Sequence, residues 1–210
     1  MLFRSGAPNN VAVYGTLARQ FYFPNPVPDG FYTGSEVPEP WVGLAENYYA
    51  FEWGDALFVV LDPYRYELVD RKVSGDFWDW SIGSTQYEWL ASTLRASTAK
   101  YKFVFAHHVL GECRGGVIWA DKFEWGGKNA NGTWGFSTRR PGWSKPLHQL
   151  FVETGVQAFF QGHDHLYARE EVDGVVYQSV PQPSTSRYQG PDLAREYGYR
   201  ATPGDTAFVT

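Results

Sequence analysis

Three things are scarce in this sequence: cysteine, positive charge and long apolar segments. The single cysteine, Cys113, cannot form a disulfide within the chain, so cysteine usage leaves the cellular compartment undetermined. The 18 Lys and Arg residues are outnumbered by 23 Asp and Glu, and the net charge of -5 argues against a nucleic-acid-binding surface. No apolar run approaches the roughly 20 residues that span a bilayer. We therefore expect neither nucleic acid nor a membrane as a partner.

Aromatic residues, by contrast, are abundant. They make up 18% of the 210 residues, roughly twice their usual share, which favours β structure and aromatic-walled loops. Residues 1–46 are also rich in proline and glycine, so we expect an irregular arm there. Residues 47–210 have the length of a single domain, interrupted by a Gly- and Trp-rich excursion at 111–143.

Strands and helices are expected to alternate after the arm. Alternating or continuous apolar runs predict a hairpin at 48–62 and strands at 102–106, 156–160 and 175–180. One helix is expected from Thr85, which starts a capping-box pattern, and another over 145–154, capped by Ser144 and ended by Gly155. This order predicts an α/β fold in which helices cover a sheet.

Two of the expected strands end in histidine. The strand at 102–106 is followed by His107 and His108, and the strand at 156–160 leads through Gly162 to His163 and His165. Open α/β sheets build their sites at this edge, and neutral imidazole is the commonest protein ligand for zinc, iron and related ions. The pattern indicates a metal centre, although turn histidines that bind backbone groups are the alternative.

With these motifs, residues 47–183 resemble the C-terminal half of a calcineurin-like metallophosphoesterase, the superfamily that includes the purple acid phosphatases. Gly162-His163-Asp164-His165 matches the Gly-His-x-His motif of that family, and His107 resembles its earlier strand-end ligand, with Val109 in place of a frequent proline. The resemblance implies a layered α/β/β/α sandwich. It also implies that His107 and His163 face one metal ion and that His165 faces a second.

The resemblance further implies hydrolysis of small phosphate esters by two divalent or trivalent ions (Zn, Fe or Mn), which supply a hydroxide nucleophile. His108 is a candidate to stabilise transition-state charge, although packing or hydrogen bonding is the alternative role. Asp164 is expected either to orient a metal ligand or to be an exposed turn residue. Tyr167 and Arg169 are assigned to the mouth of the site by the family likeness alone.

Half of the family's ligand set has no counterpart in this sequence. The family carries Asp-x-His and Gly-Asn-His motifs, which supply a bridging carboxylate and further ligands, and neither occurs here. Gly75-Asp76-Phe77-Trp78-Asp79 fits a third family motif, Gly-Asp-x-x-Asp, but no buried strand precedes it. We interpret it as a solvated turn or a chance match. The sequence therefore predicts a truncated chain without the N-terminal half of the domain.

Three functions remain open on these grounds. The chain is the histidine-rich half of a phosphoesterase, or an inactive fragment or module that holds one metal ion or none. A third possibility is an aromatic-rich carbohydrate- or partner-binding domain, for which core packing is the favoured alternative. That interpretation rests on four tryptophans of the excursion: Trp119, Trp125, Trp134 and Trp143. Without its first half, the sheet would expose an edge and a face, which predicts self-association.

Overall fold

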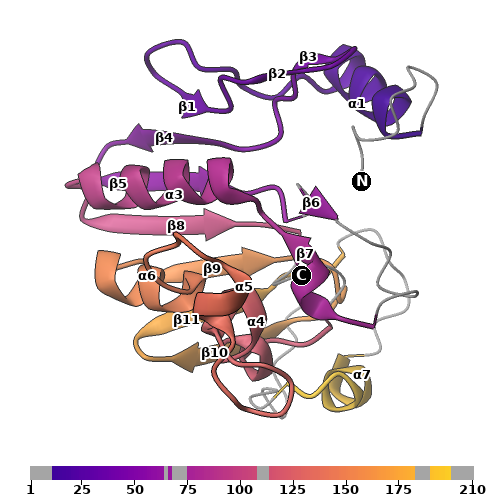
Figure 1. The fold of residues 1–210 in the computed structure, drawn as a ribbon, viewed down its shortest axis with the longest axis vertical. Helices are drawn as coiled ribbons and strands as arrows, with labels where there is room; N and C mark the ends of the chain where they lie inside the picture. Colours follow the sequence, from indigo (N-terminus) through magenta and orange to yellow (C-terminus); the bar gives the residue numbers. More distant parts are fainter. Residues whose placement is uncertain (1–10, 64–65, 68–74, 108–113, 183–189, 200–210) are drawn as a thin grey trace.

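A seven-stranded mixed sheet lies at the centre of the chain (Figure 1). The computed structural model describes residues 11–63, 66–67, 75–107, 114–182 and 190–199. The strands of this sheet are β1 (Thr33–Gly34), β4 (Tyr49–Trp53), β5 (Ala56–Val60), β8 (Tyr101–Phe105), β9 (Ala158–Gln161), β10 (Ala168–Val172) and β11 (Val175–Ser179). Their spatial order is β1-β4-β5-β8-β9-β11-β10. Strands β5, β8, β9 and β11 run parallel, so their carboxyl ends meet at one edge.

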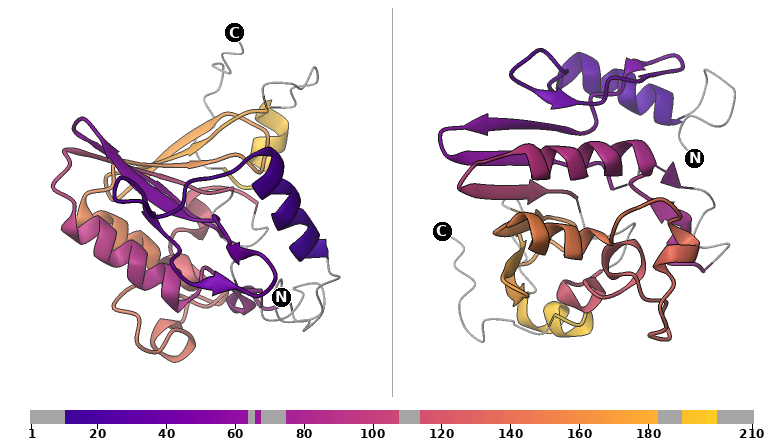
Figure 2. Two further views of the ribbon diagram at one scale, coloured as in Figure 1. Left: turned by 90° about the horizontal axis from the view of Figure 1, so that it is seen from above. Right: turned by 60° about the vertical axis from the view of Figure 1, so that its left-hand side comes forward.

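Helices α3 (Ser84–Ala96) and α6 (Leu147–Thr154) lie side by side on one face of the sheet (Figures 1 and 2). Leu90, Leu94 and Leu150 of these helices are fully buried. They belong to one core cluster with Val59, Val104 and Phe159 of the strands. The predicted α/β class is confirmed, because the apolar stripe of each helix covers the sheet.

The remaining elements lie around this layer, and all but α1 are short. They are α1 (Val11–Tyr22), β2 (Pro38–Glu39), β3 (Gly43–Leu44), β6 (Tyr66–Glu67), η1 (Phe77–Asp79), β7 (Trp80–Ser81), η2 (Val117–Trp119), α4 (Phe123–Gly126), α5 (Phe136–Arg139) and α7 (Gly190–Glu196). Among the described residues there is no helix with the length and apolar character needed to cross a membrane.

The expectation of a wholly irregular arm at 1–46 is wrong, because α1 forms twelve residues of helix there. Pro8 precedes this helix and the next proline is Pro24, so nothing in 11–22 removes a backbone donor or forces an extended residue. Arg19 forms an ion pair with Glu46 at 3.2 Å, which ties the helix to the end of the arm.

The helix ends agree with the sequence in one place and differ in two. Gly155 ends α6 in the left-handed conformation, with φ of 72°, as expected of a glycine stop. The predicted caps are wrong: α3 starts at Ser84 after Gly83, and α6 starts at Leu147 after Pro146, with no side-chain cap on either. The Ser144 hydroxyl instead lies 2.9 Å from the hydroxyl of Tyr87.

A buried ion pair holds the excursion against the rest of the chain. Glu124 of α4 is fully buried and pairs with the Arg140 guanidinium. The Glu124 carboxylate also accepts from the Ser81 hydroxyl at 2.7 Å and from the Ile82 amide at 2.9 Å. Arg140 in turn donates to the carbonyl oxygens of Trp78 and Trp80. The two charges and the end of β7 thus meet in one buried cluster.

The tryptophans of the excursion serve mainly as packing groups. Trp125 is 1% exposed and donates through its indole nitrogen to the Tyr177 hydroxyl at 2.8 Å. Trp143 stacks on Tyr87 with ring centroids 3.9 Å apart, and Trp119 packs against the main core. Trp134 is exposed. These contacts favour the core-packing interpretation over a sugar-binding row of tryptophans.

The opposite face of the sheet carries a continuous row of aromatic rings. Strand alternation places five half-buried phenylalanines there: Phe51, Phe58, Phe103, Phe105 and Phe160. Neighbouring rings touch, with centroids 5.1 Å apart for Phe51 and Phe58 and 4.9 Å apart for Phe105 and Phe160. None of the five belongs to the buried core. The described part of the chain therefore covers one face of its sheet more fully than the other.

The buried pair yields a prediction about stability. Glu124→Gln keeps the shape of the side chain and leaves the Arg140 guanidinium buried without its counter-charge, so unfolding should become about 3 kcal/mol easier. Arg140→Met should cost a similar amount. Urea denaturation of both variants measures this, with Asp192→Asn, which removes a surface ion pair, as the control that should change nothing measurable. Two single variants as stable as the parent would contradict the prediction.

Candidate functional site

The parallel strands bring the predicted histidines to one edge of the sheet. Backbone bonds join the strand ends: Ala106 donates to the Phe160 carbonyl at 3.1 Å, and the amides of Gly162 and His163 both donate to the carbonyl of His107. His107 directly follows the end of β8, and His163 follows β9. The register of the two strands thus fixes the separation of the two side chains.

His107 and His163 are in direct contact. The Nε2 atom of His107 lies 3.0 Å from Nδ1 of His163, and the ring centroids are 4.9 Å apart at an interplanar angle of 77°. His107 is exposed and His163 half-buried. Two imidazole nitrogens on one zinc-like ion, each about 2.0 to 2.1 Å from it, would be separated by about 2.9 to 3.4 Å. The observed separation falls in that range.

His165 leaves the line of the strand. Its φ of 52° lies in the left-handed region, where histidine is several-fold more common than most residues but still infrequent. His163 and His165 therefore do not follow the alternation of a regular strand. The exposed His165 remains close enough to influence His107. Partial desolvation lowers the pKa of His107 below its usual value and His165 lowers it further, while the Asp164 carboxylate opposes both.

A neutral His107 is the form that binds a metal, since the ligand must have an unprotonated nitrogen. Within the described residues, however, no group of three or more His, Cys, Asp or Glu side chains is arranged to hold an ion. The histidine pair fits two ligands of one metal. A pair of ions would also need carboxylates between them. The assignment of His107, His163 and His165 as ligands stays a prediction.

Asp164 is buried, so the exposed-turn interpretation is wrong. Its side chain is 3% exposed and its two oxygens already have partners. Arg114 donates to one oxygen at 3.1 Å, while the Gly115 amide, at 2.8 Å, and the Tyr199 hydroxyl, at 2.6 Å, donate to the other. No local pattern indicates this, because Tyr199 lies 35 residues away in the chain. Asp164 anchors the histidine turn to the loop at 114–117.

The other predicted site residues are less central. His108 lies outside the described residues. Tyr167 is half-buried between the histidine turn and β10. Arg169 is exposed on β10 and pairs with Glu171 at 3.4 Å, with its backbone opposite Gln178 near the same sheet edge. The roles of Tyr167 and Arg169 at the mouth of the site stay predictions.

The Gly75–Asp79 segment behaves as a capped turn. Asp76 accepts from the Trp78 amide at 3.0 Å at the start of η1, and its other oxygen pairs with Arg139 at 2.9 Å. These contacts explain the acidic residue at the start of the segment without a metal. They support the interpretation of this motif as a chance match.

Two residues near the sheet edge were not anticipated. Arg114 is about half exposed and pairs with Asp164, which places its guanidinium next to the histidine turn. A single arginine in a glycine-rich loop does not predict this position from the sequence. Asp62 follows the end of β5, where the Leu61 amide donates to the Phe105 carbonyl. Burial raises the pKa of Asp62 to about 6, although a hydrogen bond from Asn47 opposes the shift.

No protein-family model matches this sequence, and no curated protein is significantly similar to it. Solved structures give low-level matches. GAP50, the anchor in the inner membrane complex of Plasmodium, has a TM-score of 0.36 at 14% identity, covering 67% of this chain and 38% of its own. The purple acid phosphatase PPD1 from yellow lupin (Lupinus luteus) seeds has a TM-score of 0.35 at 18% identity, covering 65% of this chain and 23% of its own.

A PhoD structure is the third match, with a TM-score of 0.41 at 12% identity, covering 80% of this chain and 33% of its own. The chain thus spans between 23% and 38% of the length of these three structures. At such TM-scores the likenesses carry no argument about function. The function must be inferred from the chain's own residues and their contacts.

The raised pKa of Asp62 predicts how stability depends on pH. A carboxyl group that holds its proton more tightly in the folded chain stabilises it fully below the unfolded value of 3.8, and this contribution is lost as pH rises through about 6. Asp62→Asn cannot ionise, so the variant should gain about 1 to 3 kcal/mol relative to the parent between pH 4 and 7. Urea denaturation across this range measures the difference.

Asn47→Ala provides the opposite change. It removes the hydrogen bond that favours the ionised Asp62 carboxylate, so the loss of stability between pH 4 and 7 should become larger. Parallel pH profiles for the parent and both variants would refute the assignment.

Proposed function

We propose that this chain contributes the histidine half of a metal-dependent phosphate-ester hydrolase. The observation that carries the proposal is the 3.0 Å contact between His107 Nε2 and His163 Nδ1 at the carboxyl ends of two parallel strands. Small phosphate esters are the proposed substrates, and zinc, iron or manganese the proposed ions. The Gly-His-x-His motif and the strand that precedes it support the choice of reaction class.

In this proposal His107 and His163 bind one ion and His165 is available to a second. A bound pair of ions would supply a hydroxide nucleophile and neutralise phosphate charge. The carboxylates that such a pair requires are proposed to come from a complementary part of the protein, because both Asp164 oxygens already have partners and the described residues form no group of three or more possible ligands. The full activity therefore belongs to the protein that combines this half with its complement.

The chain's own groups have definable roles around the ions. Asp164 holds Arg114 beside the histidine turn, and the Arg114 guanidinium is suited to attract a phosphate and stabilise its developing charge. Burial raises the pKa of Tyr199, so its hydroxyl stays protonated and donates to Asp164. Asp164 and Tyr199 thus position the Arg114 guanidinium and do not contact the substrate themselves. His108 is proposed to assist transition-state charge or proton transfer to the leaving group.

A second candidate function is supported by the ligand count. Two adjacent imidazoles bind a single ion without a bridging carboxylate, and the described residues offer no such carboxylate at this position. In that case the chain is a single-metal-binding module with no hydrolytic activity. The two functions are separated by measuring metal content and turnover on the same preparations.

The test compares the parent chain with His107→Ala and His163→Ala. After incubation with zinc, manganese or iron, we expect at least one ion per parent chain and a loss of at least about 100-fold in affinity in each variant. The control is His148→Gln, which removes a buried histidine that contacts Tyr177 and Asp173 and leaves the proposed ligands intact. Metal content and hydrolysis of p-nitrophenyl phosphate are measured together.

Each outcome has a defined meaning. Hydrolysis by the parent that is lost in His163→Ala supports the hydrolase, whereas bound metal without hydrolysis supports the single-metal module. A parent chain that binds no metal, or variants that bind as much as the parent, would overturn both.

We also propose that the aromatic face drives self-association of the isolated chain. Phe58 and Phe105 occupy the middle of that face, and association would bury their rings. Phe58→Thr combined with Phe105→Thr places a residue of high strand propensity at both positions, removes the two rings and should shift the chain towards monomer. Sedimentation velocity over a concentration series checks this, with circular dichroism to verify folding. A parent chain that stays monomeric throughout would contradict it.

A further inference from the structure

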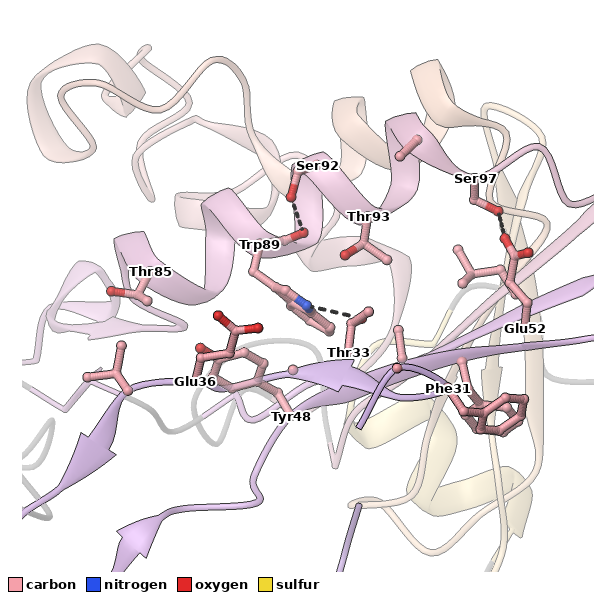
Figure 3. Close-up of a pocket in the computed structure, with 17 residues that line it drawn as sticks. Phe31, Thr33, Glu36, Tyr48, Glu52, Thr85, Trp89, Ser92, Thr93 and Ser97 are labelled. Atoms are coloured by element: carbon pink, nitrogen blue, oxygen red, sulfur yellow. Dashed lines mark hydrogen bonds between the residues drawn. The ribbon is translucent and has the colours of Figure 1, made fainter. Parts of the chain in front are cut away.

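A pocket separate from the histidines lies between α3 and the strands at the β1 edge of the sheet (Figure 3). It has a volume of about 820 Å³, within the usual range for small-molecule sites. Its walls come from α3 on one side and from β1, β4 and the segment at 30–37 on the other. None of its lining residues is one of the three proposed histidine ligands. An inference about this pocket therefore does not depend on the proposed hydrolase.

Aromatic side chains form part of the pocket wall. The indole of Trp89 lies at its middle and its nitrogen donates to the Thr33 hydroxyl at 3.3 Å (Figure 3). Tyr48 packs against Trp89 with ring centroids 4.9 Å apart, which braces the indole from one side. Trp89 is half-buried at the border between the buried and the exposed face of α3, where it packs against the main core. A braced and partly accessible indole is suited to stack on a flat apolar ligand face.

The polar groups of the pocket are mainly hydroxyls. Five Ser and Thr residues line it: Thr33, Thr85, Ser92, Thr93 and Ser97. Three of these hydroxyls already bond within the chain: Thr33 accepts from the Trp89 indole, Ser92 donates to the Trp89 carbonyl and Ser97 donates to Glu52. A hydroxyl oxygen has two lone pairs, so ligand hydroxyls can still donate to Thr85, Ser92 and Thr93. Because apolar groups also line the pocket, a ligand that carries both hydroxyl groups and apolar C–H faces suits this wall.

The charged groups that line the pocket are carboxylates, which disfavour anionic ligands and stabilise a cationic ligand only weakly. None of the described lining residues is Lys, Arg or His, so a phosphate or carboxylate would meet no counter-charge. Of the two carboxylates, Glu52 accepts from the Ser97 hydroxyl, and Glu36 has no partner among the described residues. Glu36 is exposed, so water and salt weaken its attraction for a cation. It remains a good acceptor for ligand hydroxyls.

We propose that this pocket binds a neutral oligosaccharide. One sugar ring stacks its C–H face on Trp89, and its hydroxyls bond to Glu36 and to the Ser and Thr side chains around it. The site would attach the protein to a saccharide or present one, separately from any chemistry at the histidines.

The test measures binding of three neutral probes, maltotriose, cellotriose and the N-acetylglucosamine trimer, by calorimetry and saturation-transfer NMR. At least one should bind, with an affinity that changes less than about twofold between low and high salt. Trp89→Ala should weaken it by at least about tenfold. Trp53→Ala, which removes a 72% exposed tryptophan outside the pocket, is the matched control and should bind as the parent does.

Two further variants keep the proposal testable if Trp89→Ala fails to fold. Ser92→Trp fills the pocket from an exposed helix position and should abolish binding, while Glu36→Gln should weaken neutral probes by no more than about threefold. A pentalysine peptide tests the cationic alternative. Binding of this peptide alone, no binding of the three sugars, or an equal loss in Trp53→Ala would overturn the proposal.

Discussion

The buried pair of Glu124 and Arg140 is the constraint on which the irregular half of the molecule depends. A charged pair without water is tolerated only when nearly every donor and acceptor finds a partner, and here the partners are the Ser81 hydroxyl, the Ile82 amide and the carbonyls of Trp78 and Trp80. Those groups belong to residues 78–82, which directly precede α3. The pair therefore fixes the excursion to the start of the helix that covers the sheet. Because α4 also contacts α6, and α6 contacts α3, the cluster is in contact with both helices of the layer through one or two elements.

A second set of constraints acts at the sheet edge. There the backbone, rather than any side chain, determines where the histidines lie, because the carbonyl of His107 accepts from both Gly162 and His163. The Asp164 carboxylate then anchors the turn through hydrogen bonds from Arg114, Gly115 and Tyr199. The contacts that hold the turn also occupy both oxygens of the Asp164 carboxylate, which makes it a poor metal ligand. Asp164 holds the turn in place and does not bind a metal in the proposed centre. The carboxylates of that centre must therefore come from elsewhere.

The sequence predicted the features that depend on local pattern. Strand-to-histidine units, the Gly155 stop and the α/β order all depend on residues close together in the chain. It did not predict α1, because the composition of the proline-rich arm concealed a proline-free stretch at 11–22. It also missed the burial of Asp164 and the Glu124–Arg140 pair, whose partners lie between 16 and 62 residues apart in the chain. A polar residue whose partners are distant looks, in sequence, like any solvated one.

The two faces of the central sheet are best understood through the strands themselves. A strand with one solvated face alternates apolar and polar residues, whereas Phe58, Val59 and Val60 of β5 and Phe103, Val104 and Phe105 of β8 are apolar throughout. Such strands are made for a sheet covered on both sides. The described helices bury the side of Val59 and Val104, while the phenylalanines of the other side are left packing against one another. The residues of β5 and β8 are therefore typical of strands covered on both sides, while the described residues fully bury the Val59 and Val104 side and leave the phenylalanine side half-buried.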